Sequence, residues 1–170
     1  MDFKEIIHIL QERRETIATM ESCTGGGVAN AITNCEGASE ILKFSAVTYS
    51  NEYKIKMGVS SEVIDKYTVY SMETADEMSK NITKFANSNY GVGITGQLNR
   101  QDPANPVGKD NVVYISIYDS TNDKYYRETI EVHKESRKLN KDHVIERIIE
   151  MLLKICLLYT SPSPRDKRQS

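Results

Sequence analysis

A turn rich in nucleophilic side chains lies between a strand pattern and a helix pattern near the start of this chain. Residues 16–20 alternate β-branched and apolar side chains, which predicts a short buried strand. Residues 28–32 are largely apolar and predict a helix. The turn between them holds two hydroxyls and a thiol and then three glycines: Ser22, Cys23, Thr24, Gly25, Gly26 and Gly27. A strand that passes through such a turn into a helix is typical of an α/β fold.

This turn is suited to chemistry because of what a helix N-terminus offers. The first N–H groups of a helix have no partner within the helix, and the helix dipole makes that end positive. Glycines there let a ligand approach the backbone closely. A serine on the turn can attack a carbonyl carbon while neighbouring N–H groups hold the oxyanion. Serine and threonine are also ordinary helix caps, and the turn matches neither the G-x-S-x-G nor the G-x-x-x-x-G-K-[ST] pattern.

The remainder of the chain alternates helical and strand patterns. Amphipathic spacing predicts helices over residues 3–14, 71–87 and 135–155, and shorter ones over residues 28–34, 39–42 and 60–67. β-Branched and aromatic residues predict strands over residues 44–50, 90–95, 111–118 and 125–132. We expect the strand over residues 44–50 to be buried, and Phe85 to face the core. This order of elements predicts one three-layer α/β/α domain with a mixed sheet.

Composition narrows the functional classes. The chain has 170 residues, of which 39% are hydrophobic and 27% are charged, and its net charge is −2. Such a chain can bury a substantial core, and it has no basic excess that favours nucleic acid or a membrane surface. No apolar run is long enough to span a membrane, and the N-terminus has no signal-peptide pattern. Cys23, Cys35 and Cys156 show neither disulfide nor zinc spacing, so we expect a cytoplasmic protein without a metal or cofactor.

Two short motifs resemble a known family. The segment ESCTGG at residues 21–26 is followed, after a gap, by VTYSNE at residues 47–52 and then by Lys54. Their order and separation are similar to those of the CinA C-terminal domain family, which comprises nicotinamide-mononucleotide amidohydrolases and their relatives. Weaker similarity runs from about residue 3 to about residue 155. The resemblance implies a stand-alone form, since longer family members carry an additional N-terminal domain.

The resemblance implies a reaction and a set of site residues. The substrate would be a pyridine mononucleotide, nicotinamide mononucleotide, and the products would be nicotinate mononucleotide and ammonia. Ser22 would be the nucleophile and Lys54 the general base, assisted by Tyr49 and Ser39. A lysine can act as a base only if its pKa is depressed, for example by burial. The resemblance further implies substrate-binding roles at Thr24, Gly25, Gly26, Thr95, Gly96, Arg100 and Arg137, and it leaves a homodimer open.

Each of these assignments competes with a simpler interpretation. Cys23 could be the attacking group in place of Ser22, because thiols are better intrinsic nucleophiles. Four residues could take no part in the chemistry: Lys54 as an exposed lysine, Tyr49 as a core residue, Ser39 as a helix cap, and Arg137 as the partner of Glu135. His8, His133 and His143 show no metal or triad spacing, so we expect them to be surface residues.

The loop over residues 96–109 departs from the family pattern. Family members have a glycine-rich loop of the kind T-G-I-A-G-P-x-G-G, whereas this chain has TGQLNRQD from Thr95 and then NPVGK from Asn105. Either Arg100 and Gln97 hold the phosphate, or the substrate has changed, or the site no longer turns over. The alternative function is therefore a non-catalytic nucleotide-binding protein of the same fold. A scaffold for DNA uptake finds no basic patch to support it.

The C-terminal residues form a separate segment. Residues 156–170 are rich in serine, proline and basic residues from Thr160 onward and have no helical or strand period, which is typical of a disordered tail. The run CLLYTSPSPRD also resembles one reading frame of a transposon adaptor used for sequencing libraries. We prefer the second interpretation and place the end of the domain at residue 155.

Overall fold

The computed structural model describes residues 1–133 and 135–158. Within this part the chain forms a five-stranded mixed sheet with helices packed on it. The strands are β1 (Ile17–Glu21), β2 (Leu42–Val47), β3 (Tyr90–Gly96), β4 (Val112–Asp119) and β5 (Lys124–Glu131). The helices are α1 (Lys4–Arg13), α2 (Gly27–Thr33), α3 (Ala38–Ile41), α4 (Asn51–Lys56), α5 (Ser61–Tyr67), α6 (Met72–Ala86) and α7 (Arg137–Leu158).

The sheet runs in the order β2-β1-β3-β4-β5. β1 pairs in parallel with both β2 and β3, whereas β3–β4 and β4–β5 are antiparallel. The last two strands form an antiparallel hairpin, and the predicted mixed sheet is confirmed. Because β1, β2 and β3 are parallel, their carboxyl ends meet at one edge of the sheet, where ligands bind in many open α/β folds.

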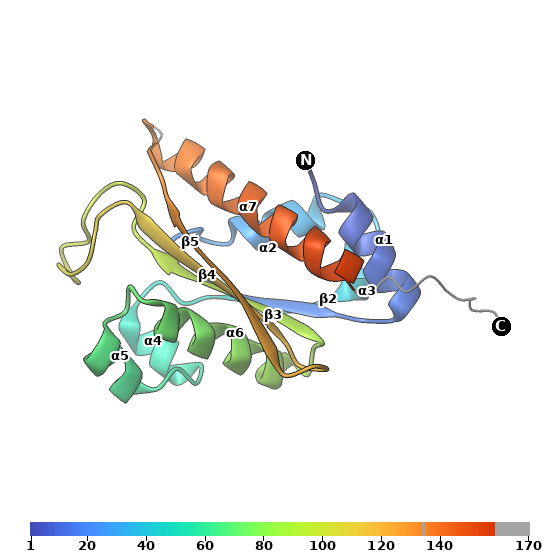
Figure 1. Ribbon diagram of the computed structural model, residues 1–170, viewed down its shortest axis with the longest axis horizontal. Helices are drawn as coiled ribbons and strands as arrows, with labels where there is room; N and C mark the ends of the chain where they lie inside the picture. The colour runs from blue at the N-terminus through green and yellow to red at the C-terminus, as the bar shows by residue number, and fades with distance from the viewer. Residues whose placement is uncertain (134, 159–170) are drawn as a thin grey trace.

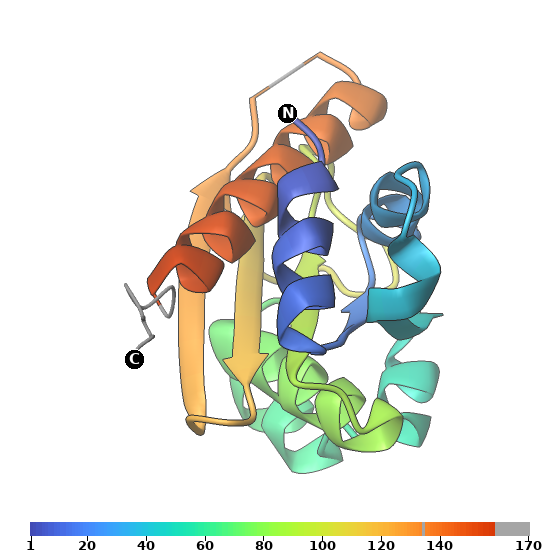
Figure 2. The same ribbon diagram turned by 90° about the vertical axis from the view of Figure 1, so that its right-hand side faces the viewer.

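Helices cover both faces of the sheet and make the predicted three layers (Figure 1). α1, α2, α3 and α7 lie on one face, and α4, α5 and α6 lie on the other; Figure 2 shows α1 beside α7. The larger apolar core lies under α1, α2 and α7 and includes Phe3, Ile32 and Ile148. The smaller core joins β1 to α6 through Met20 and Met78. Among the described residues, no helix combines the length and the apolar character needed to cross a membrane.

Two expectations about burial were wrong: that the second strand is buried, and that Phe85 faces the core. β2 is an edge strand, and half of its residues are exposed. β2 has a neighbouring strand, β1, on one side only, and its other side has no strand. Its apolar sequence therefore does not make it a fully buried strand. The side chain of Phe85 at the end of α6 is 64% exposed and packs on Phe44 of β2, with the two ring centroids 5.2 Å apart. Phe85 therefore covers the open edge of the sheet and does not enter the core.

α7 is longer than the predicted helix. It continues through Leu158, and Cys156 near its end is buried. The carbonyl oxygen of Cys156 accepts a hydrogen bond of 2.6 Å from Arg13 at the end of α1. Residues 155 and 156 thus both pack in the domain, while residues 159–170 of the predicted tail lie outside the described residues.

Candidate active site

Ser22 and Lys54 lie together at the carboxyl edge of the parallel strands. Ser22 is the first residue after β1, and Lys54 lies in α4, the helix that follows β2. The Nζ atom of Lys54 is 2.9 Å from the Oγ atom of Ser22. Lys54 is only 1% exposed and Ser22 is 6% exposed. The structure therefore pairs a serine hydroxyl with a buried amine, so the interpretation of Lys54 as an exposed lysine is wrong.

The connection from β2 to α4 explains how a lysine becomes buried here. Ser50 caps α4, and its Oγ accepts the N–H of Tyr53. Lys54 is the buried residue of this short helix. The N–H of Thr48 donates to the carbonyl oxygen of Glu21 (2.8 Å), which ties the ends of β2 and β1 together. The carbonyl oxygen of Thr48 in turn accepts a hydrogen bond of 2.6 Å from the Lys54 Nζ.

Burial changes the pKa of the Lys54 amine and of the Cys23 thiol, and both changes favour Ser22 over Cys23 as the candidate nucleophile. Burial lowers the pKa of Lys54 to about 8, against weaker opposing effects of Cys23 and Asp102. At pH 7 about a tenth of the protein molecules then have Lys54 as a neutral amine that can accept a proton. Burial also raises the pKa of the Cys23 thiol to about 12. Because the thiolate is the reactive form of cysteine, Cys23 is a weaker candidate nucleophile than its neighbour.

Glu21 holds the turn beside Ser22, a role that the sequence reasoning did not assign. Its fully buried carboxylate accepts hydrogen bonds from the Thr24 hydroxyl (2.7 Å) and from the N–H groups of Val28 (3.0 Å) and Ala29 (2.9 Å). These are the first free N–H groups of α2, so Glu21 occupies the helix N-terminus that an anionic ligand would otherwise use. Glu21 fixes the turn that carries Ser22. The one signal in the sequence was its place in the ESCTGG motif.

Gly25 and Gly26 allow the backbone to turn between β1 and α2. Gly25 and Gly26 have φ angles of +59° and +93°, in the left-handed region that favours glycine. The N–H of Gly25 donates to the carbonyl oxygen of Ser22 (2.9 Å), so this N–H is not free to hold an oxyanion. Thr24, Gly25 and Gly26 line a different hollow, of about 660 Å³, together with Lys138 and Lys141 of α7. The structure does not bring these three predicted binding residues to the cleft at Ser22.

Thr95 and Gly96 have structural roles at the end of β3. The Thr95 hydroxyl is buried and donates to the carbonyl oxygen of Val69 (2.9 Å). A Cβ atom at Gly96 would lie 2.5 Å from the backbone of Val113 in β4, so a glycine is needed for strand packing. Neither residue lines the cleft at Ser22.

A cleft of about 360 Å³ opens beside Ser22. It is lined by Ser22, Tyr49, Tyr70, Gln97, Leu98, Arg100, Gln101, Asp102, Pro103 and Arg137. Arg100, Arg137 and Tyr49 are thus three predicted residues that the structure brings to the cleft beside Ser22. Tyr49 is 63% exposed, so it is not a core residue, and its hydroxyl accepts a hydrogen bond of 3.2 Å from Arg137. In the described part of the chain, Arg137 makes no ion pair with Glu135.

Ser39 lies away from this cleft. It is an exposed residue of α3, which directly precedes β2, whereas Lys54 comes after the other end of that strand. In the parallel pairing, the start of β2 lies beside Ile17, at the opposite end of β1 from Ser22. Ser39 does not cap α3 either, because Gly37 occupies the N-cap position. The predicted catalytic role of Ser39 therefore finds no geometric support.

Gln97 organises the divergent loop from within. Its side chain is 3% exposed, and its amide nitrogen donates to the carbonyl oxygens of Val107 (3.0 Å) and Lys109 (3.2 Å). Its amide oxygen accepts the N–H of Asp102 (2.6 Å). Because these contacts use both N–H donors of the amide, Gln97 has none left for a phosphate. Of the two residues considered for that role, Arg100 remains.

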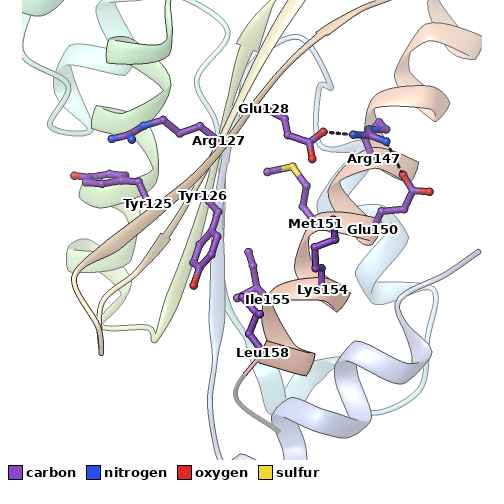
Figure 3. A pocket seen from close by; sticks show the side chains of 10 residues that line it. All are labelled: Tyr125, Tyr126, Arg127, Glu128, Arg147, Glu150, Met151, Lys154, Ile155 and Leu158. Atoms are coloured by element: carbon purple, nitrogen blue, oxygen red, sulfur yellow. Dashed lines mark hydrogen bonds and ion pairs between the residues drawn. The ribbon is translucent and has the colours of Figure 1, made fainter.

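A further hollow of about 570 Å³ lies between β5 and α7, as Figure 3 shows. Arg147 in its wall pairs with Glu128 and Glu150. None of the predicted site residues lines this hollow, and the described residues of its lining include no serine, cysteine or threonine. It therefore offers no counterpart of the pair formed by Ser22 and Lys54.

Comparison with known proteins agrees with the two motifs. The CinA C-terminal domain family matches residues 3–156. The chain belongs to this family. A relative from Thermoanaerobacter pseudethanolicus, named as a competence-damage inducible protein, is 36% identical over 146 residues, which are 84% of this chain and 34% of the relative. A CinA-like protein from Kosmotoga olearia is 40% identical over 116 residues, or 66% of this chain and 27% of that protein. The chain thus spans about a third of the length of these curated relatives.

Solved structures of the family have the same fold. The competence/damage inducible protein CihA from Agrobacterium tumefaciens superposes with a TM-score of 0.79 at 25% identity, over 89% of this chain and 91% of that one. A CinA superfamily protein from Escherichia coli gives a TM-score of 0.78 at 21% identity, over 89% and 87% of the two chains. The names of these four proteins state neither a substrate nor a reaction.

Proposed function

We propose that this chain is an amidohydrolase that converts nicotinamide mononucleotide to nicotinate mononucleotide and ammonia. The observation that carries the proposal is the buried Lys54 amine, 2.9 Å from the Ser22 hydroxyl. A serine is a weak nucleophile until a neighbouring base accepts its proton, and a buried lysine of lowered pKa can be that base. The substrate is the one that the resemblance to the CinA C-terminal domain family implies.

In the first step Ser22 attacks the carboxamide carbon of the substrate. The lone pair of the neutral Lys54 amine takes the proton from the Ser22 Oγ as the C–O bond forms. One N–H of Lys54 remains bound to the carbonyl oxygen of Thr48, which orients the lone pair. The Tyr49 oxygen accepts from Arg137, so its own O–H is free to donate to the oxyanion. Tyr49 thereby stabilises the oxyanion in place of the Gly25 N–H, which already donates to the carbonyl oxygen of Ser22.

The tetrahedral intermediate then loses ammonia. Its C–N bond breaks, and the leaving nitrogen receives the proton that Lys54 holds, which restores the neutral amine. The product of this step is an ester between Ser22 and the nicotinoyl group. A water molecule attacks the ester, and Lys54 again acts as base by taking a proton from the water. The bond to the Ser22 Oγ then breaks, Lys54 gives the proton to that oxygen, and nicotinate mononucleotide leaves.

Two arginines support binding of a phosphorylated substrate. Arg100 and Arg137 both line the cleft, and neither forms an ion pair within the described residues. A guanidinium group suits a phosphate because its planar fork donates two parallel hydrogen bonds. The exposed position of both side chains suits a group at the cleft mouth, with the carboxamide deeper, at Ser22.

Parallel measurement of both products tests this function. Purified protein is incubated with nicotinamide mononucleotide, and ammonia and nicotinate mononucleotide are quantified over time. The proposal predicts that they form in equal amounts. Calorimetric binding of the mononucleotide without release of ammonia would instead support a non-catalytic nucleotide-binding protein. The divergent loop over residues 96–109 favours this alternative, because it lacks the glycines of the family pattern.

A further inference from the structure

The divergent loop over residues 96–109 places an ionised carboxylate, that of Asp102, in the cleft beside Ser22. Asp102 lines the cleft, and its carboxylate accepts hydrogen bonds from the Tyr70 hydroxyl (2.7 Å), the Ala104 N–H (2.9 Å) and the Asn105 amide (3.2 Å). The hydrogen bond from Tyr70 is the main reason why the pKa of Asp102 lies below its ordinary value. Asp102 therefore carries a full negative charge at neutral pH.

This charge has no cationic partner in the described part of the protein. No arginine or lysine nitrogen there lies within 4.0 Å of the Asp102 carboxylate, although Arg100 and Arg137 line the same cleft. Asp102 also raises the pKa of the Lys54 amine. A raised pKa opposes the neutral amine that the proposed reaction needs. The carboxylate is therefore unfavourable for the chemistry unless a ligand brings a positive charge.

The loop is held in place before any ligand arrives. Gln97 binds the N–H of Asp102, and the Asn105 side chain, which donates to Asp102, accepts a hydrogen bond from Asn51 at the start of α4 (2.9 Å). Tyr70 holds the carboxylate from the segment before α6. Contacts from three parts of the fold thus fix one carboxylate in the cleft, which is the preorganisation that ligand recognition favours.

The cleft has the charges and surfaces of a site for a zwitterion that contains an aromatic cation. Tyrosine rings attract cations, and a carboxylate does so more strongly, so Asp102, Tyr49 and Tyr70 suit a positively charged ring. Arg100 and Arg137 suit an anionic group on the same molecule. Building on the proposed function, we propose that Asp102 binds the cationic ring of a pyridinium nucleotide and makes the site select charged rings over neutral ones.

The ring cation would also act on the proposed base. Once the ring neutralises Asp102, the effect that raises the pKa of Lys54 is lost, and a second positive charge on Lys54 becomes unfavourable. Bound substrate therefore favours the neutral amine in its own site. A neutral ring would leave Asp102 free to stabilise protonated Lys54. Selection by Asp102 thus acts on both binding and deprotonation.

Two ligands that differ in ring charge test the proposal. Nicotinamide mononucleotide has a cationic ring, whereas its dihydro form has a neutral ring with the same carboxamide and phosphate. Calorimetry with Ser22→Ala, which prevents turnover, should give about tenfold tighter binding of the cationic form. Adding Asp102→Asn should abolish this preference, chiefly by weakening the cationic ligand. Adding Tyr70→Phe, which removes a hydrogen bond to the carboxylate but keeps its charge, should retain the preference.

The outcomes separate this proposal from the proposed function. Equal weakening of both ligands by Asp102→Asn means that Asp102 only shapes the loop, and it overturns the charge-selection proposal. Ammonia release by the wild-type protein would still support the amidohydrolase in that case. A preference for the cationic ring without ammonia release supports the binding role of Asp102 and contradicts the reaction. Failure of both ligands to bind the Ser22→Ala protein overturns the proposal for Asp102.

Discussion

The Lys54 Nζ atom lies 2.6 Å from the carbonyl oxygen of Thr48, the first residue after β2. A carbonyl can only accept hydrogen bonds, so this contact commits one N–H of the amine and leaves the rest of the group directed at Ser22. The backbone of Thr48 is itself anchored through its N–H to Glu21 at the end of β1. The strand ends therefore position Lys54, while burial sets its pKa.

The pH dependence of the reaction follows from that pKa. Burial lowers the pKa of Lys54 from 10.5 to about 8, and only the neutral amine can act as a base. We expect kcat/KM to rise about tenfold between pH 7 and pH 9 and then to level off. Because Asp102 raises this pKa, Asp102→Asn should move the rise to lower pH. A rate that keeps rising beyond pH 10 would mean that the amine is not desolvated.

The same pKa predicts how stability changes with pH. The folded-state value is about 8 and the ordinary value is 10.5, so between these pH values the unfolded chain binds more protons than the folded protein. The free energy of unfolding must then increase with pH across this window. From pH 7 to pH 10, urea denaturation of the wild type should show a gain about 2–3 kcal/mol larger than that of Lys54→Met. Equal gains for the two proteins would contradict a lowered pKa.

Arg100 is predicted to bind the phosphate. Its exposed side chain lines the cleft, and Arg100→Ala should weaken binding of nicotinamide mononucleotide about tenfold by loss of a charge-assisted hydrogen bond. Binding of nicotinamide riboside, which lacks the phosphate, should hardly change. Arg100→Lys keeps the charge but not the fork, so it should give an intermediate loss. Calorimetric titration of both ligands decides the matter, and equal effects on the two would exclude contact with the phosphate.

Local patterns were sufficient for the fold, whereas the central pair of the site was predicted from the resemblance of two motifs to a known family. The turn from β1 to α2, the hairpin of β4 and β5, and the three layers all follow from periodicity and turn residues that lie close together in the sequence. The motifs around Ser22 and Lys54 marked two residues that are 32 positions apart and prove to be in contact. Periodicity alone would not have paired them.

Residues whose role depends on distant partners were not predictable. Gln97 was considered as a phosphate ligand and Asp102 was assigned no role. In the structure Gln97 binds the loop backbone, and Asp102 binds Tyr70, 32 positions away in the chain. Ser39 was placed in the site by resemblance, whereas the parallel pairing of β1 and β2 places it at the other end of the strand. The exposure of β2 depended on the order of strands in the sheet, which no single segment encodes.

Release of ammonia from nicotinamide mononucleotide by wild type, Ser22→Ala and Cys23→Ala tests the central claim most directly. The Lys54 amine contacts the Ser22 hydroxyl, and burial keeps the Cys23 thiol protonated. We predict that Ser22→Ala lowers kcat at least about a thousandfold while mononucleotide binding stays measurable, and that Cys23→Ala retains most of the activity. Full activity in Ser22→Ala, or its loss in a folded Cys23→Ala protein, would contradict the account.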